Sequence, residues 1–295
     1  MSHLTKLTRR MVLAVSLSIL PVQTALVLSA SADEASNTQG GSNVATSEQK
    51  VLLEKAMNAL FRDFDEDAMR ALYAEDYKQH NPNVLTGLDP VIGLLPLLNE
   101  AEFDYETHRV IEDGDLLLTH TTYTNAEVFG AKEVVAFDLW RIEDGKVAEH
   151  WDAIIPKYTE TASGRSQADG MTEIVDLDKT GQNKALVEGF VREVLMGGET
   201  DKMETYIRDG LYNQHNPVVE DGPDALEAVL GEIKNNTLHR MVGEGNFVLT
   251  QAEGTWNGMP VAIYDLFRVV DGYIVEHWDV IQEIPAQMAH ENGMF

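Results

Sequence analysis

The chain of 295 residues is 44% hydrophobic and 24% charged, values that are typical of a globular protein and exclude a disordered or fibrous one. Its net charge of −27 excludes nucleic acid and anionic membrane surfaces as expected partners, because a strongly negative field repels both. Without any cysteine, the protein has no disulfide, thiol nucleophile or thiolate metal site.

The first 32 residues have the composition of an export signal. Three basic residues (Lys6, Arg9 and Arg10) precede a long apolar stretch, and the segment ends in the cleavage pattern Ala30-Ser31-Ala32. We therefore predict a signal peptide at 1–32 and an exported protein, periplasmic or secreted, with no stable membrane insertion after cleavage. An uncleaved anchor is the alternative, and the adjacent arginines leave open a twin-arginine or a general export route.

The mature chain is expected to begin with a flexible segment and then to form helices. Residues 33–46 are rich in Ser, Asn, Gly and Thr, as flexible segments are. Ser47 can cap a helix whose apolar residues recur at helical spacing from Val51 to Leu60, and a shorter helix is expected near 67–72. The dipeptide Asp89-Pro90 predicts a third helix with proline at its first position.

The segment Gln79-His80-Asn81-Pro82 is expected to be extended, because proline disfavours the α region for the residue before it. After the third helix the hydrophobic period changes to that of strands. Four strands are predicted at 104–112, 115–124, 132–142 and 147–155, with Asp-Gly turns closing two of the hairpins. Helices followed by an antiparallel meander predict an α+β domain in which the helices cover one face of the sheet.

An internal repeat is the strongest signal in the sequence. Four motifs return in the same order after 127 to 135 residues: 77–82 returns as 212–217, 108–109 as 239–240, 137–141 as 264–268, and 149–152 as 276–279. Solenoid repeats are only about 20–50 residues long, so the repeated unit here is a whole domain. We predict domains at 47–156 and 180–285, a linker at 157–179 and a C-terminal tail at 286–295.

This order of elements, with the Gln-His-Asn-Pro motif and the closing Glu-His-Trp-Asp motif, resembles the SnoaL-like polyketide cyclase family, and in particular its members of the aldol-condensation type. That family belongs to the nuclear transport factor 2-like superfamily. The resemblance covers about 47–156 and 180–285. It implies two tandem α+β domains of the cystatin-like cone shape, each with three helices packed on a curved antiparallel sheet around a pocket.

The resemblance also implies what the pocket does. It points to cofactor-free, metal-free aldol condensation, cyclase-type or isomerase chemistry on a small hydrophobic carbonyl compound. The acid/base aspartate of the family matches Asp152 and Asp279 best. Because members of the family commonly pair through their sheets, the chain is expected to be a pseudo-dimeric monomer or a homo-oligomer.

The register of the last hairpin decides which side chains share the pocket. With the three-residue loop Glu143-Asp144-Gly145, Asp138 stands opposite His150 and Ala136 opposite Asp152, so the three polar residues share one face. A two-residue Asp-Gly loop shifts the register by one and moves His150 and Asp152 to the other face from Asp138. The sequence leaves both registers open, and the second copy poses the same question.

Under the first register the pocket holds two carboxylates and an imidazole beside an indole. Burial raises the pKa of a carboxylate, as a base that removes a proton next to a carbonyl group requires, and a neighbouring histidine can donate to the enolate or hold the base in position. The catalytic candidates are Asp138, His150, Asp152, Asp265, His277 and Asp279. The substrate-binding candidates, at the pocket mouth or wall, are His80, Asn81, His215, Asn216 and Trp140.

Three other functions compete with this one. An Asp-Arg-Asp set (Asp138, Arg109 and Asp152) can activate water in a hydrolase or dehydratase. A metal site built from His80, His150 and Asp138 lacks any recognised ligand spacing, so we expect no metal. A non-catalytic module that binds a small hydrophobic molecule is the rival from another class, because duplication preserves scaffold residues as readily as catalytic ones.

Overall fold

The computed structural model describes residues 46–295 apart from residue 209. The predicted signal peptide and nearly all of the predicted flexible segment lie outside the described residues. In the described part of the chain, no helix has the length and apolar character needed to cross a membrane. Residues Ala45–Phe295 form one compact unit.

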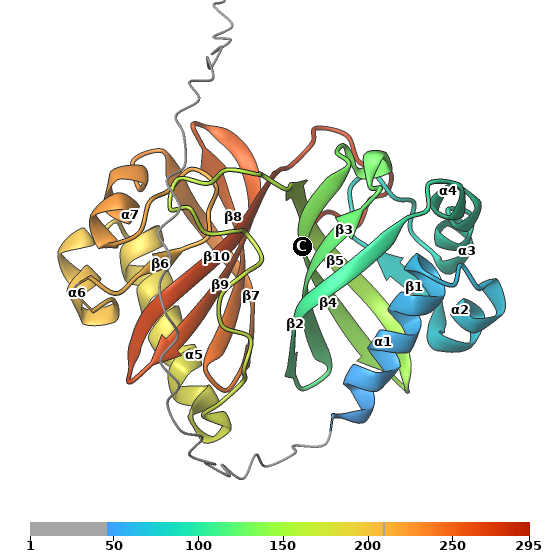
Figure 1. Cartoon of the computed structure of the whole chain (residues 1–295), viewed down its shortest axis with the longest axis horizontal. Coiled ribbons are helices and arrows are strands. Elements are labelled where there is room, and N and C mark those ends of the chain that lie inside the picture. Colours follow the sequence, from blue (N-terminus) through green and yellow to red (C-terminus); the bar gives the residue numbers. More distant parts are fainter. Residues whose placement is uncertain (1–45, 209) are drawn as a thin grey trace, which may run out of the picture. The chain divides into compact units, whose positions relative to one another are not determined.

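The first half has the expected order, with helices followed by an antiparallel meander (Figure 1). Its helices are α1 (Glu48–Phe61), α2 (Glu66–Leu72), α3 (Leu88–Ile92) and α4 (Leu95–Glu100), with a 3-10 turn at Glu127–Phe129. Its strands are β1 (Tyr73–Gln79), β2 (Asp104–Asp113), β3 (Leu116–Thr124), β4 (Glu133–Glu143) and β5 (Lys146–Pro156). They form one five-stranded sheet in the order β1-β5-β4-β3-β2, with the helices on one of its faces.

The second half repeats this plan with shorter helices. These are α5 (Thr180–Phe190), continued by a π-helical stretch (Val191–Met196), α6 (Met203–Tyr206) and α7 (Pro223–Val229), with 3-10 turns at Leu177–Lys179 and Thr200–Lys202. The strands are β6 (Asn213–Gln214), β7 (Ile233–Glu244), β8 (Phe247–Trp256), β9 (Met259–Val270) and β10 (Tyr273–Glu283). Their order in the sheet, β6-β10-β9-β8-β7, matches that of the first half. The α+β class is therefore confirmed, and both sheets have the topology that the repeat predicts.

Two details of the predicted fold are wrong. The first half has four described α-helices where three were expected, because the third predicted helix is broken between Ile92 and Leu95. Pro96, near the start of α4, has no N–H to donate to the carbonyl of Ile92, so a continuous helix would lose that bond. The sheets are also mixed: β1 runs parallel to β5, and β6 runs parallel to β10.

The first helix begins where the sequence predicts. The Ser47 side chain accepts a hydrogen bond from the Lys50 N–H at 3.0 Å and so caps α1. The buried stripe of the helix runs through Leu53, Ala56 and Leu60, whereas Val51, which the prediction placed on the apolar face, is exposed. The predicted place of Pro90 at the first position of its helix is wrong, because α3 begins two residues earlier at Leu88, whereas Pro223 is the first residue of α7 in the second half.

The two sheets share one core, formed by the faces that lie away from the helices. Alternate residues of the strands supply it, so Leu139 and Trp151 from the first sheet belong to the same buried cluster as Leu266 and Trp278 from the second. The even-numbered residues of β4, and those of β5 from His150 on, point to the other face, toward the helices. The tryptophans of the two Glu-His-Trp-Asp motifs are therefore core residues between the halves.

The arginines of the repeated His-Arg motif pack against this shared core. The Arg109 guanidinium lies 4.2 Å from the ring centroid of Trp278, and Arg240 lies 4.1 Å from that of Trp151. Each arginine also donates to the residue opposite it on the next strand, Arg109 to His120 at 3.0 Å and Arg240 to Gln251 at 2.8 Å. The motif therefore recurs because each half uses the same arginine to hold the tryptophan of the other.

Candidate active site

The last hairpin of the first half combines features of both predicted registers. Its loop is the two-residue one, Asp144-Gly145, and both residues have positive φ, at 49° and 72°. A bulge at Ala148 then adds one residue to β5, so that Arg141 pairs with Glu149 and Asp138 pairs with Asp152. The extra residue returns His150 and Asp152 to the face of the sheet that Asp138 occupies, from which the two-residue loop alone would have removed them. The predicted shared face is therefore right, but the predicted cross-strand partners are wrong.

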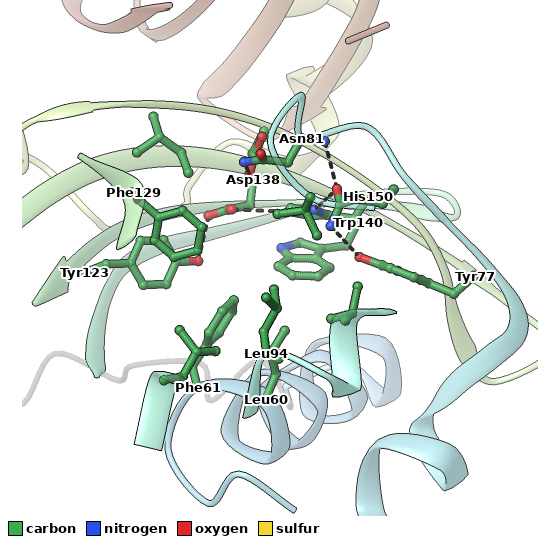
Figure 2. A pocket seen from close by; sticks show the side chains of 16 residues that line it. Leu60, Phe61, Tyr77, Asn81, Leu94, Tyr123, Phe129, Asp138, Trp140 and His150 are labelled. Carbon is green, nitrogen blue, oxygen red and sulfur yellow. Dashed lines mark hydrogen bonds and ion pairs between the residues drawn. The ribbon is translucent and has the colours of Figure 1, made fainter. Parts of the chain in front are cut away.

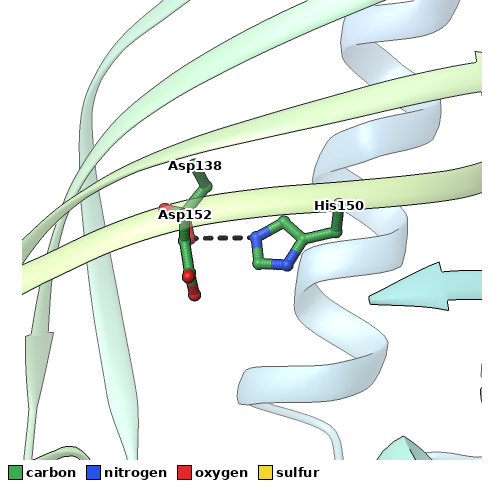
Figure 3. A group of neighbouring side chains, drawn as sticks. All are labelled: Asp138, His150 and Asp152. Carbon is green, nitrogen blue, oxygen red and sulfur yellow. Dashed lines mark hydrogen bonds and ion pairs between the residues drawn. The ribbon is translucent and has the colours of Figure 1, made fainter. Parts of the chain in front are cut away.

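Three polar side chains meet on this face, as Figure 3 shows. Asp138, His150 and Asp152 are each buried, with 2 to 4% of their surface exposed. The His150 Nε2 lies 3.2 Å from the Asp138 Oδ1. The ligand-type atoms of the three residues lie within 4.8 Å of one another. The structure thus brings together the three catalytic candidates of the first half.

Gln79 fixes which nitrogen of His150 carries a proton. Its Oε1 accepts from the backbone N–H groups of His80, at 2.8 Å, and Asn81, at 2.9 Å, so this atom is an acceptor. The same oxygen lies 2.9 Å from the His150 Nδ1, which must therefore donate. A single proton is then shared between the His150 Nε2 and Asp138. Both ring nitrogens are engaged, so His150 positions Asp138 and has no N–H left to donate to a substrate.

The second oxygen of Asp138 accepts two hydroxyl hydrogen bonds. Tyr123 donates at 3.1 Å, and Thr119 donates at 3.4 Å. The Trp140 indole N–H donates in turn to the Thr119 hydroxyl at 3.1 Å, and the Trp140 ring lies 4.0 Å from that of His150. Asp138 is therefore held on both sides by protein groups.

Only one of the two carboxylate oxygens of Asp152 has a hydrogen-bond partner among the described residues. The Asn81 amide donates to its Oδ2 at 2.7 Å, whereas its buried Oδ1 has no hydrogen-bond partner among the described residues. Burial raises the pKa of Asp152 to about 6; the charge of Asp138 acts in the same direction, and His150 and Asn81 oppose it. Asp152 is thus a carboxylate with a free acceptor oxygen and the pKa of a general base.

A pocket between sheet and helices exposes these groups to a ligand (Figure 2). The empty space in and in front of the pocket, open solvent included, is about 480 Å³. Asp138, His150 and Asp152 lie on the sheet side, while Leu60, Phe61 and Leu94 project from the helical side. Most of the wall is apolar, which is the pattern of a site that binds a hydrophobic molecule and orients it through a few polar groups.

The second half contains the same arrangement. A two-residue loop and a bulge at Val275 place Asp265 opposite Asp279, and the His277 Nε2 lies 3.1 Å from Asp265. The amide of Asn216 donates to both oxygens of Asp279, at 2.9 and 2.7 Å. Burial raises the pKa of Asp279 to about 6, with Asp265 adding to the rise and His277 and Asn216 opposing it. These four residues line a second pocket, also of about 480 Å³.

His80 and His215 do not line the pockets, contrary to the prediction. The His80 ring stacks on Trp151 at 4.9 Å, and its nitrogens lie 2.9 Å from Glu149 and 2.8 Å from the Gly293 carbonyl. His215 stacks on Trp278 in the same way, at 4.6 Å. In the extended Gln-His-Asn-Pro segment, histidine and asparagine point to opposite faces, so only the asparagine reaches the pocket. Of the predicted binding residues, Asn81, Asn216 and Trp140 do line a pocket.

Segments of the predicted linker and tail hold these two loops in place. Ala289 donates to the Pro82 carbonyl at 2.8 Å, and Ala162 donates to that of Pro217 at 2.9 Å. The tail also contacts the first loop through Asn292, which donates to the Gln79 carbonyl at 2.9 Å. Each pocket loop is therefore fastened by the segment that follows the last strand of the other half. The two segments share Ile-Pro at their start and Asp-Gly-Met or Asn-Gly-Met near their end, at 169–171 and 292–294.

Arg109 is absent from the pocket, so the predicted Asp-Arg-Asp set does not form. Its guanidinium donates to the carbonyls of Ala168, Asp169 and Met171, at 3.1, 2.6 and 2.8 Å. Its place on β2 directs it to the sheet face that meets the second half. The metal set of His80, His150 and Asp138 does not form either, because His80 lies on that same face.

Two described clusters have a donor set that fits a metal ion: Asp138, His150 and Asp152, and their copies in the second half. Such a set suits a divalent cation that accepts imidazole and carboxylate ligands. In the structure, the His150 Nε2 and Asp138 share a proton, and a bound cation would have to replace it. The geometry therefore permits either a proton-transfer network or a metal site at these atoms.

Sequence reasoning missed three polar residues of the first site, namely Gln79, Tyr77 and Tyr123. The Gln79 side chain joins the site at both ends, because its amide also donates to the Tyr77 hydroxyl at 3.3 Å. Gln79 and Tyr77 stand in the repeated motif, so their recurrence was the available signal. Tyr123 has no such signal, because the strand pairings place Gly254 at the corresponding position of the second half.

Known structures resemble about a third of the chain at low identity. TsrD from Streptomyces laurentii is 19% identical, with 36% of this chain and 87% of that chain covered and a TM-score of 0.32. A Mycobacterium tuberculosis LEH-like epoxide hydrolase is 22% identical (35% and 85% covered, TM-score 0.30). An NTF2-like protein of Cytophaga hutchinsonii is 15% identical (39% and 95% covered, TM-score 0.31). Likeness at this level carries no information on substrate or reaction.

No curated protein matches the chain. One family model does match, over the segment that runs from within α1 through α4 and most of the sheet of the first half. That segment includes Asn81, Asp138 and His150, whereas Asp152 lies just beyond its end. Residues 54–150 match the family described as the SnoaL-like domain.

Proposed function

We propose that the protein is a cofactor-free acid-base enzyme that removes a proton next to the carbonyl group of a small hydrophobic compound, in an aldol-condensation, cyclase-type or isomerase reaction. The observation that carries this proposal is the free Oδ1 of Asp152. It is a buried acceptor with no partner among the described residues, on a carboxylate whose pKa is raised to about 6, at the wall of an apolar pocket. A base of this kind is ionised near neutral pH and still accepts a proton readily.

In the proposed reaction, the C–H bond next to the carbonyl breaks, and its proton moves to the Asp152 Oδ1. The electron pair moves to the carbonyl oxygen, which becomes an enolate. In an aldol step the enolate carbon then bonds to a second carbonyl carbon, the π electrons of that carbonyl move to its oxygen, and this oxygen takes the proton back from Asp152. In an isomerisation, Asp152 returns the proton to a different carbon of a conjugated enolate. Asn81, bound to the other oxygen of Asp152, keeps the base pointed at the pocket while its charge changes.

The Tyr77 phenol is the donor best suited to the enolate oxygen, because the Tyr123 hydroxyl already donates to Asp138. Burial raises the pKa of Tyr77 and of Tyr123 well above the usual value of 10, so both hydroxyls stay protonated at any working pH. Tyr77 accepts from Gln79 and gives its own hydrogen to no described residue, which leaves that hydrogen for a substrate. Hydrogen bonds aimed at a developing charge in a dry pocket are a main source of rate enhancement.

Proton exchange tests this proposal whatever the final product is, because every version of the reaction begins with loss of the α-proton. The full-length protein is incubated in D₂O with a panel of small ketones, and loss of the α-proton signal is followed by NMR. The double variant Asp152→Asn/Asp279→Asn should lower the exchange rate by about 10²- to 10⁴-fold. Its matched control is Asp144→Asn/Asp271→Asn, which removes the same charges from the exposed hairpin loops and should leave exchange unchanged.

Other outcomes separate the rival functions. Ketones that bind but exchange no faster than in buffer would identify a binding module and overturn the enzyme. Exchange that is lost on dialysis against a chelator and restored by a divalent cation would assign the two clusters to a metal. Export is proposed on the N-terminal pattern alone, and N-terminal sequencing of the protein from the producing cell should show a mature chain that begins at Asp33.

A further inference from the structure

The two pockets share a scaffold but differ in how their polar groups are paired. In the first, Tyr123 and Trp140 supply the hydroxyl and the indole N–H that hold Asp138 and Thr119. The strand pairings place Gly254 at the position of Tyr123 and Phe267 at that of Trp140. The second pocket therefore has neither donor.

Three polar atoms of the second half are left without a partner as a result. Among the described residues, nothing hydrogen-bonds the Asp265 Oδ2, the Thr250 Oγ1 or the Asn235 Nδ2. Their residues are 4, 0 and 3% exposed, so water does not reach them freely. Asp265 and Asn235 both line the pocket, and Thr250 is the cross-strand partner of Asp265. A buried polar group without a partner is costly, and a ligand is a common source of the missing bond.

Gly254 accounts for the presence of Asn235 in the wall. A Cβ atom at position 254 would lie 2.3 Å from the Lys234 carbonyl oxygen, so only glycine permits this close approach of β7 to β8. Asn235 is the partner of Gly254 across the two strands, and a bulge follows it in β7. At the matching place in the first half, Tyr105 pairs with Tyr123, and the Tyr105 hydroxyl donates outside the pocket, to Asn58 at 3.0 Å.

The apolar walls of the two pockets also differ, in their content of aromatic rings. Five aromatic rings line the first pocket: Phe61, Tyr77, Tyr123, Phe129 and Trp140. Only two of the residues that line the second are aromatic, Tyr212 and Phe267, and the rest of its apolar wall is aliphatic. Flat ring faces favour a flat, aromatic ligand, whereas an aliphatic wall has no such preference.

We infer that the two pockets take different ligands: the first a planar aromatic carbonyl compound, and the second a non-aromatic carbonyl compound that also carries a hydroxyl group. The ligand hydroxyl donates to the Asp265 Oδ2, and the ligand carbonyl oxygen accepts from the Asn235 amide. That both ligands contain a carbonyl group rests on the proposed function. The difference between them rests on the unpaired atoms and the wall residues.

Isothermal titration of the full-length protein with two probes tests the inference. The probes are 2-acetylnaphthalene, an aromatic ketone, and 4-hydroxycyclohexanone, a hydroxylated aliphatic one. Each should bind at one site per chain. Asn235→Leu should weaken the hydroxyketone about tenfold, the size of one lost hydrogen bond, and should leave the naphthyl ketone unchanged. Tyr123→Phe should leave the hydroxyketone unchanged.

Further arms keep the test decisive. Asn235→Ala, which removes the amide without adding bulk, replaces Asn235→Leu if that variant does not fold, and it should weaken only the hydroxyketone. Cyclohexanone should bind the second pocket about tenfold more weakly than 4-hydroxycyclohexanone. The inference is overturned if either probe fails to bind, if one probe fills both pockets equally, or if Asn235→Leu leaves the hydroxyketone unaffected. Selective binding without any α-proton exchange would instead uphold it and reject the proposed enzyme.

Discussion

Asp138 and Asp152 lie directly opposite each other on neighbouring antiparallel strands, both buried and both facing the pocket. Two carboxylates in this position repel each other, and a single residue, the bulged Ala148, is what places them there. The shared proton of His150 and Asp138 and the amide of Asn81 relieve part of the repulsion. The same relationship joins Asp265 and Asp279 in the second half, where Val275 is the bulged residue. The arrangement therefore arises twice in one chain.

The proposed activity should depend on pH with a single rising limb. Burial raises the pKa of Asp152 and of Asp279 to about 6, and only the ionised carboxylate accepts a proton. The rate of α-proton exchange should therefore increase from pH 5 to pH 7, with its midpoint near 6. NMR exchange rates measured across this range check the midpoint. A rate that is flat from pH 4 to 8 would exclude both residues as the base.

Asp152→Asn should stabilise the protein at high pH. The pKa of Asp152 in the folded state, about 6, is above that of an ordinary aspartate, so the folded state favours the protonated form. Folding is therefore most favoured by this group at pH values below its ordinary pKa, and that contribution is lost as pH rises through about 6. The melting temperature of Asp152→Asn should exceed that of the native protein at pH 8, and the two should converge near pH 4. A gap that widens toward acid pH would contradict the assignment.

Equivalent threonines in the two halves should respond to valine with opposite signs. Thr119 links Trp140 to Asp138, so Thr119→Val leaves both partners with a lost bond and should lower the free energy of unfolding by about 1–3 kcal/mol. Thr250 is buried with no partner among the described residues, so Thr250→Val should raise that free energy by about 1 kcal/mol. Denaturant titration of the two variants checks both signs. Equal losses would mean that Thr250 is satisfied by a group such as a bound water.

Arg109→Met should lower the stability of the protein and leave its rate of α-proton exchange unchanged. The guanidinium is buried, donates to three carbonyls and covers Trp278, so its loss should cost about 3 kcal/mol of stability. The variant that remains folded at low temperature should exchange α-protons at the native rate. Arg141→Met is the control, because Arg141 is only half-buried and pairs with Glu149 near the end of β4, and it should cost less. A loss of exchange in folded Arg109→Met would restore the Asp-Arg-Asp set as a candidate.

The sequence by itself determined the α+β class and, to within one residue, the bounds of the four meander strands of the first half, because these follow from local patterns. It named Asp138, His150 and Asp152 as candidates but left open whether they share a face. Alternation, Asp-Gly turns and the Ser47 cap act over a few residues, and the repeat shows the same solution twice. The split of the third helix at Pro96 was also readable from one residue, although the prediction missed it.

The tertiary structure alone decided which face each polar residue occupies. Side chains alternate between the two faces along a strand. The one-residue bulge at Ala148 therefore moves every later residue of β5 to the face opposite to the one that the loop length alone would give it. It also decided that His80 and Arg109 serve the core between the halves, and that the tail from Ala289 to Gly293 fastens the first pocket loop. These contacts join residues far apart in the chain, and the two fastening segments make them with backbone groups and with side chains such as Asn292 and Ser163. Local sequence patterns report on neighbours within a few residues, so they do not show which distant segments meet.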